Sequence, residues 1–515
     1  SISGGKSIPD LFLSQARINP GKIILSDQIS GTKTYRELIT AVMVLKPVLE
    51  NLPGDVIGIM LPASVSAAIV YLAAIFSGKT PVMINWTVGT TFMQHCLNTS
   101  SVTHVITAKA LLEKLKNQGL DYSSIDVNWI ELENIVKNIS IFQKASAFIK
   151  SRLSFSSLSK SKISDTAAIL FTSGSEAKPK AVPLSHHNFI SNLKDFSTTL
   201  HFYSNDRLLG MLPPFHSLGL AGTIIMPLCI GLKTVYHPNP TEAVSLVGLI
   251  RAYKVSLLLG TPTFINGIIK AAKAKDLATI RLVFTGAEKC PDHIYDLFNQ
   301  TCPEAVMCEG YGITECSPVV SVNSDKNPVP GTIGKILPSM EYVIIHPENS
   351  ARIPVGEQGL LLVKGPNVFA GYLKGEAKSP FVDFEGEKYF DTGDLVKEDM
   401  NGILTFCGRL KRFIKLGGEM ISLPAIENVL MNALSDKSEE GPVLAVEATL
   451  SEYHPEVVLF ITRDLEREEI NNIIRQSGLS GLHNVRKVVK LDKIPVLGSG
   501  KTDYQSLKNI LKESG

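Results

Sequence analysis

The sequence predicts an α/β protein with at least two domains. Apolar, β-branched runs such as 56–60, 167–171 and 282–286 alternate with helical patterns through the large N-terminal part of the chain. Continuous apolar strands separated by helices are typical of parallel sheets covered on both faces. The chain has 515 residues, 44% of them hydrophobic and 19% charged. It therefore exceeds the ~250–300 residues at which a single core stops growing, and its composition suits a large buried core.

The pattern changes near residue 331. Short β-rich runs around glycine turns follow, which predict antiparallel strands. After Arg409 a loop with paired glycines leads into a helix, and the rest of the chain mixes β and α character. We predict a large N-terminal domain over residues 1–408, a hinge at 409–412 and a small C-terminal domain over 413–515.

Charge and cysteine content argue against several classes of protein. Lys and Arg total 51 and Asp and Glu 49, and a formal charge of +2 gives no electrostatic case for nucleic acid as the main partner. The seven cysteines are scattered without a Cys-x-x-Cys pair, which favours reduced thiols over disulfides or zinc. Residues 1–10 show no secretory pattern, so we expect a cytoplasmic protein.

Two segments raise the question of membrane contact. Residues 56–76 are long enough to span a bilayer, but Pro62 and the serines after it predict a strand, a turn and a buried helix. Residues 135–162 are rich in Ser and Lys, with apolar residues near helical spacing. That segment is either a solvated basic surface or an interfacial helix at the inner face of a membrane with anionic lipid.

Residues 171–186, FTSGSEAKPKAVPLSH, place hydroxyls, a glycine and two lysines directly after a predicted strand. A Walker A loop needs a second glycine before its lysine, and Pro179 occupies that place. The loop still offers hydroxyls, N–H groups and the charge of Lys180 to an anion. A polar turn with solvated lysines has the same composition, so the loop by itself does not decide the chemistry.

Three further segments decide it: GYGITE at 310–315, YFDTGDLVKEDMNGILTFCGRLKRFIKLGGEMIS at 389–422 and PVLGSGK at 495–501. With the loop, and in this order, they resemble the adenylate-forming superfamily of acyl- and aryl-CoA synthetases, luciferases and adenylation domains. The resemblance implies an α/β fold whose large domain has layered α/β subdomains and a β-barrel-like subdomain, followed by a small mobile α+β domain. Ala177 and Ala181 depart from the family, because glycine is common there and alanine restricts the backbone.

The resemblance implies ATP and Mg²⁺ as cofactors, with Thr314, Glu315 and Lys501 as catalytic residues. Lys501 would bridge the substrate carboxylate and the α-phosphate, Lys411 would lie at the hinge, and His216 would pack near the acyl pocket. The residues that it places around the nucleotide are Thr172, Ser173, Gly174, Ser175 and Lys180 at the β- and γ-phosphates, Gly286, Ala287, Glu288, Gly310, Tyr311 and Gly312 at adenine, Thr314 at the α-phosphate, Glu315 on Mg²⁺, and Asp394 and Arg409 at the ribose.

Such a site suits the activation of a carboxylate. In-line attack of the carboxylate on the α-phosphorus expels pyrophosphate, and the charge on the phosphoryl oxygens calls for cations and N–H donors rather than a base. Segments including LPPFHSLGL at 212–220 and EGYGITECSPVVSVN at 309–323 look most like the synthetase domain of bacterial acyl-acyl-carrier-protein synthetases. That likeness implies a fatty acid as substrate and acyl carrier protein as acceptor, with coenzyme A as the alternative.

Other residues bear on the substrates. The apolar stretches 219–232 and 257–269 suit a tunnel for a fatty chain, although plain core has the same composition. His201 and Asp206 have the His-x4-Asp spacing of glycerolipid acyltransferases, but no second acyltransferase block is evident, so we do not expect that activity. Carrier protein is acidic, and a docking face should be basic. The candidates for that face are Lys411, Arg412, Lys415, Arg486, Lys487 and Lys490.

Overall fold

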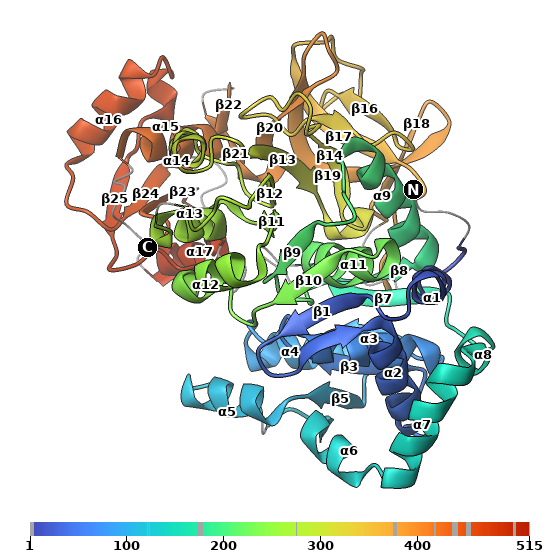
Figure 1. Ribbon diagram of the computed structural model, residues 1–515. Coiled ribbons are helices and arrows are strands. Elements are labelled where there is room, and N and C mark those ends of the chain that lie inside the picture. The colour runs from blue at the N-terminus through green and yellow to red at the C-terminus, as the bar shows by residue number, and fades with distance from the viewer. Residues whose placement is uncertain are drawn as a thin grey trace.

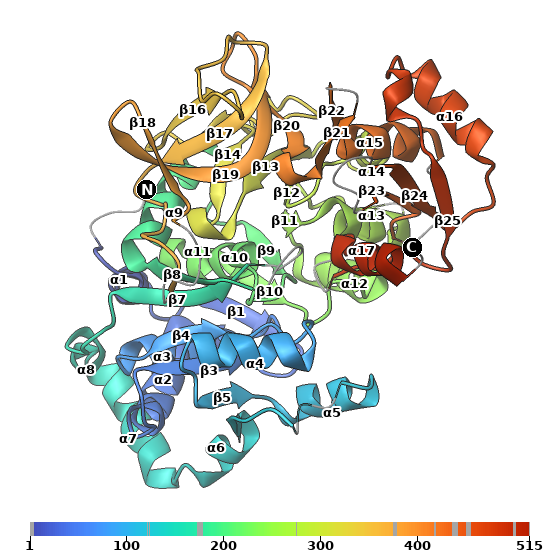
Figure 2. The same cartoon turned by 180° about the vertical axis from the view of Figure 1, so that it is seen from behind.

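The computed structural model describes residues 5–120, 122, 124–172, 179–273, 275–373, 379–416, 419–434, 441–449, 455–497 and 501–513. Within them, three sheets build the larger N-terminal part, and a smaller C-terminal part packs to one side of it (Figures 1 and 2). Ser173, Gly174 and Ser175 of the predicted phosphate loop lie outside the described residues.

A six-stranded sheet forms one layer of the N-terminal part. Its strands run in the order β6-β5-β3-β4-β7-β8 and are parallel except for the β7 and β8 pair. Side chains alternate between its faces, so Ile57 and Ile59 join the main core while Met60 packs into a second cluster on the other face. The bounds are β3 (Val56–Met60), β4 (Thr80–Met83), β5 (His104–Thr107), β6 (Asn128–Glu131), β7 (Thr166–Phe171) and β8 (Ala181–Ser185).

Helices cover both faces of this sheet. Met93 and Leu97 of α4 and Leu111 and Leu115 of α5 belong to the second cluster, whereas α3 contacts β3 and β4 from the main core. The bounds are α1 (Ile8–Ile18), α2 (Tyr35–Glu50), α3 (Val65–Phe76), α4 (Thr90–Thr99), α5 (Lys109–Asn117), α6 (Leu132–Asn138), α7 (Ile141–Leu153) and α8 (Ser156–Ser159).

Residues 56–76 are the strand, turn and buried helix that the sequence predicts. Ten of the twelve residues of α3 are buried, from Val65 to Phe76. A helix that is apolar on all sides must be covered on all sides, and α3 contacts α2, β1, β3 and β4. Every helix in the described part of the chain is too short or too polar to cross a bilayer.

A nine-stranded sheet forms the other layer, in the order β15-β14-β13-β12-β11-β9-β10-β1-β2. The six central strands from β13 to β1 are parallel, and antiparallel strands lie at both edges. The bounds are β1 (Ile23–Asp27), β2 (Gly31–Thr34), β9 (Arg207–Gly210), β10 (Lys233–Tyr236), β11 (Leu257–Gly260), β12 (Leu282–Gly286), β13 (Val306–Gly312), β14 (Val319–Val322) and β15 (Lys335–Ile336).

Helices also pack on this second sheet, which confirms the predicted α/β class. Helix α13 contacts β11, β12, α12 and α14, while α9 contacts β14 and the π-helix η1 contacts β9. The bounds are α9 (His186–Thr199), α10 (Ser217–Gly219), η1 (Leu220–Ile225), α11 (Met226–Ile230), α12 (Ala243–Tyr253), α13 (Pro262–Ala271), α14 (Asp292–Thr301) and η2 (Thr314–Cys316).

The chain from β16 onward forms a separate antiparallel sheet, which confirms the antiparallel strands predicted after residue 331. Four strands run in the order β16-β17-β19-β18, and β20 pairs with the long strand β19. Strand β20 ends at Arg409 and leads into a short 3₁₀ helix, η4. The bounds are β16 (Glu341–Ile345), β17 (Gln358–Lys364), β18 (Phe381–Phe384), β19 (Glu387–Glu398), β20 (Leu404–Arg409) and η4 (Leu410–Arg412).

The C-terminal part has its own buried clusters, formed by residues from 414 onward. Arg412 belongs to this part, because its guanidinium bonds to Glu427 at 3.1 Å and stacks 3.7 Å from the Tyr504 ring. The hinge at 409–412 stays a prediction. The bounds are β21 (Phe413–Leu416), β22 (Glu419–Ser422), α15 (Leu423–Leu434), β23 (Leu444–Ala448), β24 (Val457–Ile461), α16 (Arg467–Gln476), β25 (Lys487–Lys490) and α17 (Tyr504–Glu513).

Gly312, at the end of β13, provides a stability test of this packing. A Cβ atom there would lie 2.4 Å from the carbonyl oxygen of Pro318, a main-chain atom that cannot swing aside. We expect Gly312→Ala to lower the free energy of unfolding by about 1–3 kcal/mol, measured by urea denaturation. Gly248 in α12 is the control, because a Cβ atom there meets open space and Gly248→Ala should stabilise the protein by about 0.5–1 kcal/mol. Equal effects of the two substitutions would contradict this account.

Candidate active site

The candidate site lies where neighbouring parallel strands end. Strand β12 leads into Ala287 and Glu288, β13 into Thr314 and Glu315, and β11 into the segment that carries Thr263. In open α/β sheets, ligands bind beyond the carboxyl ends of the strands. The topology therefore brings together predicted site residues that are distant in sequence.

Close approach of β12 and β13 requires glycine at two of the predicted positions. Gly286 and Gly310 are partners in the ladder, and a Cβ atom on Gly286 would lie 2.7 Å from the Gly310 carbonyl oxygen. A Cβ atom on Gly310 would lie 2.7 Å from the Phe284 ring. Packing alone therefore accounts for these glycines, and their contact with a nucleotide stays a prediction. Ala287 follows with a φ of 72°, a strained conformation of the kind that clusters at functional sites.

Asp394 connects β19 to the other parts of the site. Its side chain is 1% exposed, accepts a hydrogen bond from the Tyr311 hydroxyl and lies 3.3 Å from Nε of Arg409, its neighbour in the β19 and β20 ladder. Burial raises the pKa of Asp394, while Arg409 and Tyr311 act in the opposite direction. The Tyr311 ring also stacks against Phe406, with 5.8 Å between centroids.

A second chain of contacts joins the predicted phosphate loop to Glu315. The Lys180 N–H donates to Oγ1 of Thr172 at 3.0 Å, and Nζ of Lys180 lies 4.7 Å from the centroid of the Tyr372 ring. The Tyr372 hydroxyl donates to Oε1 of Glu315 at 2.8 Å. The predicted phosphate-binding lysine and the predicted Mg²⁺ ligand are thus held by one tyrosine.

Glu315 suits a magnesium ion held mainly by a substrate. In the described part of the chain, three or more His, Cys, Asp or Glu side chains never gather in a metal-binding group. Mg²⁺ is commonly bound through one or two carboxylates together with substrate phosphates, so one buried carboxylate at the strand ends fits that arrangement. All seven cysteines are free thiols.

Lys501 reaches the site from the C-terminal part. It interacts electrostatically with Glu288, Arg409 and Asp394, which come from three elements of the N-terminal part. Burial lowers the pKa of the Lys501 ammonium, Arg409 lowers it further, and the two carboxylates raise it. The C-terminal part therefore lies over the strand ends in this structure. Gly498, Ser499 and Gly500, just before Lys501, lie outside the described residues.

His216 is uncharged at neutral pH in this environment. Burial and the nearby Lys501 lower the pKa of its imidazole to about 3. Its ring packs 4.5 Å from that of Phe215, and its buried Nε2 lacks a hydrogen-bond partner among the described residues. The next residue, Ser217, lies with its Oγ 3.5 Å from Oγ1 of Thr314.

Sequence reasoning missed four of these residues: Thr263, Ser217, Tyr372 and Phe406. Thr263 donates a hydrogen bond to Glu288 at 3.1 Å, and Tyr372 contacts Glu315 across 57 positions in sequence. These contacts depend on how loops meet above the sheet. The sequence contained no local signal for them.

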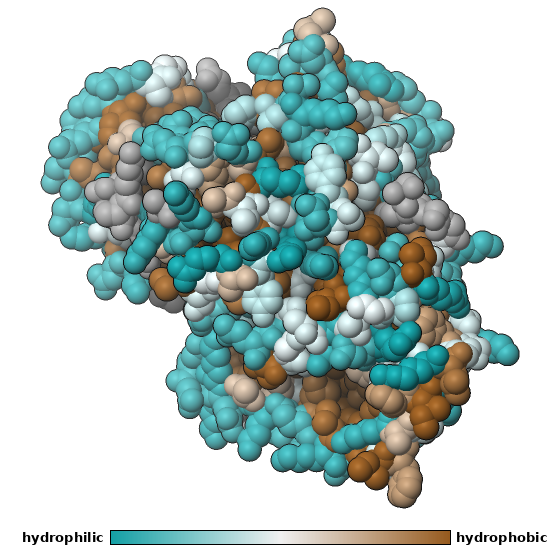
Figure 3. All heavy atoms as spheres, viewed as in Figure 1, coloured by the Kyte–Doolittle hydropathy of each residue, from teal (hydrophilic) through white to brown (hydrophobic). Residues whose placement is uncertain are grey.

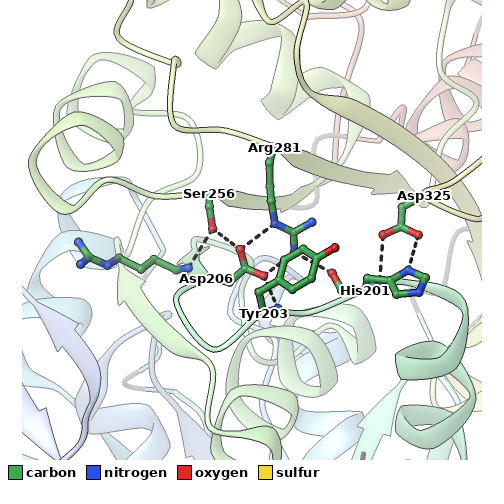
Figure 4. A network of polar contacts seen from close by, with 7 residues as sticks. His201, Tyr203, Asp206, Ser256, Arg281 and Asp325 are labelled. Carbon is green, nitrogen blue, oxygen red and sulfur yellow. Dashed lines mark hydrogen bonds and ion pairs between the residues drawn. The ribbon is translucent and has the colours of Figure 1, made fainter.

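His201 and Asp206, which have the His-x4-Asp spacing, contact different partners. His201 pairs with Asp325 at 2.8 Å, whereas Asp206 pairs with Arg281 and accepts a hydrogen bond from Ser256 at 2.8 Å (Figure 4). Asp206 directly precedes β9, Ser256 directly precedes β11 and Arg281 directly precedes β12. This network therefore lies at the amino ends of the strands, opposite the candidate site.

Solved structures of known proteins share the fold of this chain. Two solved structures, ATP-bound MatB from Rhodopseudomonas palustris (TM-score 0.79) and O-succinylbenzoate coenzyme A synthetase from Bacillus subtilis with ATP and magnesium (TM-score 0.80), are each 22% identical to this chain. Each alignment covers 98% of this chain and 99% of the solved chain. These likenesses establish the adenylate-forming fold, with the large and small parts described above.

The family follows from the sequence. The profile of the AMP-binding enzyme family matches residues 12–373, and the chain belongs to that family. It is similar to the probable 4-coumarate–CoA ligase 2 of Dictyostelium discoideum, with 29% identity over 83% of this chain and 81% of that protein. It is also similar to gramicidin S synthase 2 of Brevibacillus brevis, with 27% identity over 98% of this chain and 11% of that protein.

Glu288 should make stability depend on pH. Burial raises its pKa from 4.5 to about 7, against the opposing effects of Lys501 and Thr263. As pH rises from 4.5 to 7, the unfolded carboxyl loses its proton before the folded one, so the free energy of unfolding falls. The fall should be on the order of 2 kcal/mol.

Glu288→Gln should remove this part of the pH dependence, measured as the difference in free energy of unfolding between the two proteins at pH 5 and pH 8. Glu385→Gln is the control, because Glu385 is 61% exposed and pairs with Arg352 on the surface. A Glu288→Gln variant that parallels the unsubstituted protein across this range would contradict the prediction.

Proposed function

We propose that this protein is a cytoplasmic, AMP-forming acid:thiol ligase. In this proposal it uses ATP and Mg²⁺ to adenylate a fatty acid and then loads the acyl group onto the phosphopantetheine thiol of acyl carrier protein. Family membership supports adenylate chemistry, and the names of the similar proteins support a carboxylic acid and a thiol as substrates. The observation that supports a fatty acid as the substrate is an apolar cavity beside the candidate site.

The cavity lies between the nine-stranded sheet and the segments α9 and η1. Its lining includes Ala221, Gly222, Ile225 and Met226 on one side and Leu257, Leu258 and Leu259 on the other. These residues come from the two stretches in which the sequence suggested a tunnel. A π-helical turn such as η1 is frequent at functional sites. His216 is not among the lining residues.

The polar side chains that line the cavity are already satisfied. Asn192 donates to the Val319 carbonyl at 2.6 Å and accepts from its N–H at 3.2 Å. Ser317 donates to the Asn367 carbonyl at 2.9 Å. The cavity therefore presents mainly hydrocarbon to a ligand, which suits an alkyl chain better than a polar or charged acyl group.

The cavity also runs in the direction in which the acyl chain of a bound substrate would extend. Ser317 and Pro318 line it just beyond Glu315, while Leu208 and Leu282 line it near the amino ends of β9 and β12. A carboxylate near Thr314 would thus extend its chain along the strands, toward the network around Arg281. That network closes the amino end of the same strands with the Arg281–Asp206 ion pair and the His201–Asp325 hydrogen bond.

The residues proposed for the adenylation step stabilise charge and do not act as a general base. The carboxylate oxygen forms a bond to the α-phosphorus as the bond to pyrophosphate breaks. Lys501 and Lys180 would offset the negative charge on the phosphoryl oxygens, Glu315 would hold Mg²⁺, and Thr314 would donate to the α-phosphate. In the second step the thiol loses its proton and attacks the acyl carbon, and AMP leaves. His216, being neutral, fits a packing role beside this site.

Two observations support acyl carrier protein as the acceptor: the motifs that resemble acyl-acyl-carrier-protein synthetases, and the basic residues on the surface of the C-terminal part. Arg486 and Lys487 are exposed on the C-terminal part and remain candidates for contact with an acidic carrier. Arg412 is not one of them, and here the sequence prediction is wrong: its side chain is 12% exposed because it pairs with Glu427 inside the C-terminal part. Coenzyme A is the second candidate acceptor, since several similar proteins are named as CoA ligases.

A direct comparison of acceptors tests the proposal. Purified protein receives ATP, Mg²⁺ and palmitate with either phosphopantetheinylated carrier protein or coenzyme A, and mass spectrometry follows thioester formation. We expect turnover with carrier protein to exceed turnover with coenzyme A by at least tenfold. Faster turnover with coenzyme A would support the alternative acceptor, and absence of AMP formation with any fatty acid would refute the proposed substrate class.

Lys501→Ala should separate the two half-reactions. We expect it to lower the rate of acyl-adenylate formation by at least 100-fold, because a positive charge at the α-phosphate is lost. Thioester formation from pre-made acyl-adenylate should keep most of its rate, measured by single-turnover kinetics. Lys493→Ala is the control, because Lys493 is exposed on the same part of the chain. Equal loss in both half-reactions would overturn the role given to Lys501.

A further inference from the structure

Helix α7 turns its apolar face outward. Ile141, Phe142, Phe148, Ile149 and Leu153 are 77%, 83%, 51%, 56% and 79% exposed. Residues spaced by three, four, seven and eight positions share one face of a helix, so these side chains form a continuous stripe. An ordinary surface helix buries such a stripe against the core.

Packing on α2 fixes this orientation. Ala147 and Ser151 are the buried residues of α7, and Oγ of Ser151 lies 2.8 Å from Oγ1 of Thr40 in α2. Helices α2 and α7 pack against each other. The small residues of α7 thus pack against the protein, and its large apolar residues are left in solvent.

The charged residues of the segment that carries the stripe are all basic, while Glu37 of α2 is an acidic residue near Arg152. Residues 134–162 contain six basic side chains and no acidic one, although the whole chain carries a formal charge of only +2. The guanidinium of Arg152 lies 3.3 Å from the centroid of the Phe148 ring, so a cation borders the apolar stripe directly. The basic residues are Lys137, Lys144, Lys150, Arg152, Lys160 and Lys162.

Apolar side chains gather on the surface at this end of the molecule. Figure 3 shows them at the lower right, where Figure 1 places α6, α7 and α8. Val136 in α6 is also exposed, at 50%. A contiguous apolar surface flanked by basic residues marks an interaction site rather than scattered exposed residues.

We propose that α7 binds the surface of an anionic lipid bilayer. A helix with an apolar stripe and basic flanks lies in the interface, with the apolar residues among the acyl chains and the cations at the headgroups. Each Lys or Arg near an anionic leaflet adds to the attraction. An acidic protein partner would satisfy the lysines but would not require two exposed phenylalanines, so the combination favours lipid.

Docking through α7 leaves the rest of the protein accessible. Both ribbon views place α7 at one end of the molecule and the C-terminal part at the other (Figures 1 and 2). A bound membrane would therefore not obstruct the side from which Lys501 and an acceptor thiol reach the site. The lipid surface is independent of the proposed function, since its residues lie outside the candidate site.

Vesicle sedimentation of the full chain tests the proposal. The probes are vesicles of phosphatidylcholine alone and of phosphatidylcholine with 30% phosphatidylglycerol, each at low and high KCl. We expect the protein to pellet with the anionic vesicles and to be released by salt, because screening weakens the electrostatic attraction. Phe142→Gln with Ile149→Gln, and separately Lys144→Gln with Lys150→Gln, should each lower the bound fraction at least fivefold.

The matched control is Ile29→Gln with Met400→Gln, because these residues are 95% and 88% exposed elsewhere on the surface. That variant should bind as the unsubstituted protein does, and unchanged melting temperatures would show that all variants are folded. Phe142→Trp should in addition show fluorescence quenching by brominated lipid, which reports insertion into the bilayer.

Two results would overturn the proposal: failure of the unsubstituted protein to pellet with anionic vesicles, and undiminished binding by the Phe142 and Ile149 variant. A concentration-dependent dimer that the same variant abolishes, without vesicle binding, would instead assign the stripe to a second copy of the chain.

Discussion

The arrangement of the site depends on one buried carboxylate, that of Asp394. Tyr311 reaches it from the end of β13, Arg409 reaches it from β20, and Lys501 lies within electrostatic range from the C-terminal part. A buried carboxylate is costly unless hydrogen bonds and opposite charges offset the loss of water. Asp394 therefore favours the arrangement in which the nine-stranded sheet, the antiparallel sheet and the C-terminal part meet at one point.

The positions of that point and of the strands around it follow largely from the sequence. The apolar runs at 167–171 and 282–286 are β7 and β12, and their alternation with helices predicts parallel sheets whose carboxyl ends share an edge. Contacts between loops do not follow. Tyr372 holds Glu315 and lies beside Lys180 because two distant loops meet above the sheet, and no periodic pattern encodes that meeting.

Glycines show why a motif predicts a place more readily than a role. Gly286, Gly310 and Gly312 lie in the predicted segments, yet each is confined by its neighbours: the Gly310 carbonyl, the Phe284 ring and the Pro318 carbonyl. The same residue type would serve a close approach of ligand to backbone. In the sequence, a glycine required by packing looks the same as a glycine required by a ligand. Only the positions of neighbouring atoms distinguish packing from binding, and here packing is sufficient.

The orientation of an amphipathic helix is likewise hidden from its sequence. The spacing in 141–153 predicts a helix with an apolar face, but the period does not say whether that face meets the core or the solvent. Ala147 and Ser151 determine the orientation of α7, because they are small enough to let this helix approach α2 closely. Because that contact uses the opposite side of the helix, two phenylalanines and two isoleucines remain outside. The anionic lipid surface that we propose would cover this stripe and pair with the lysines around it.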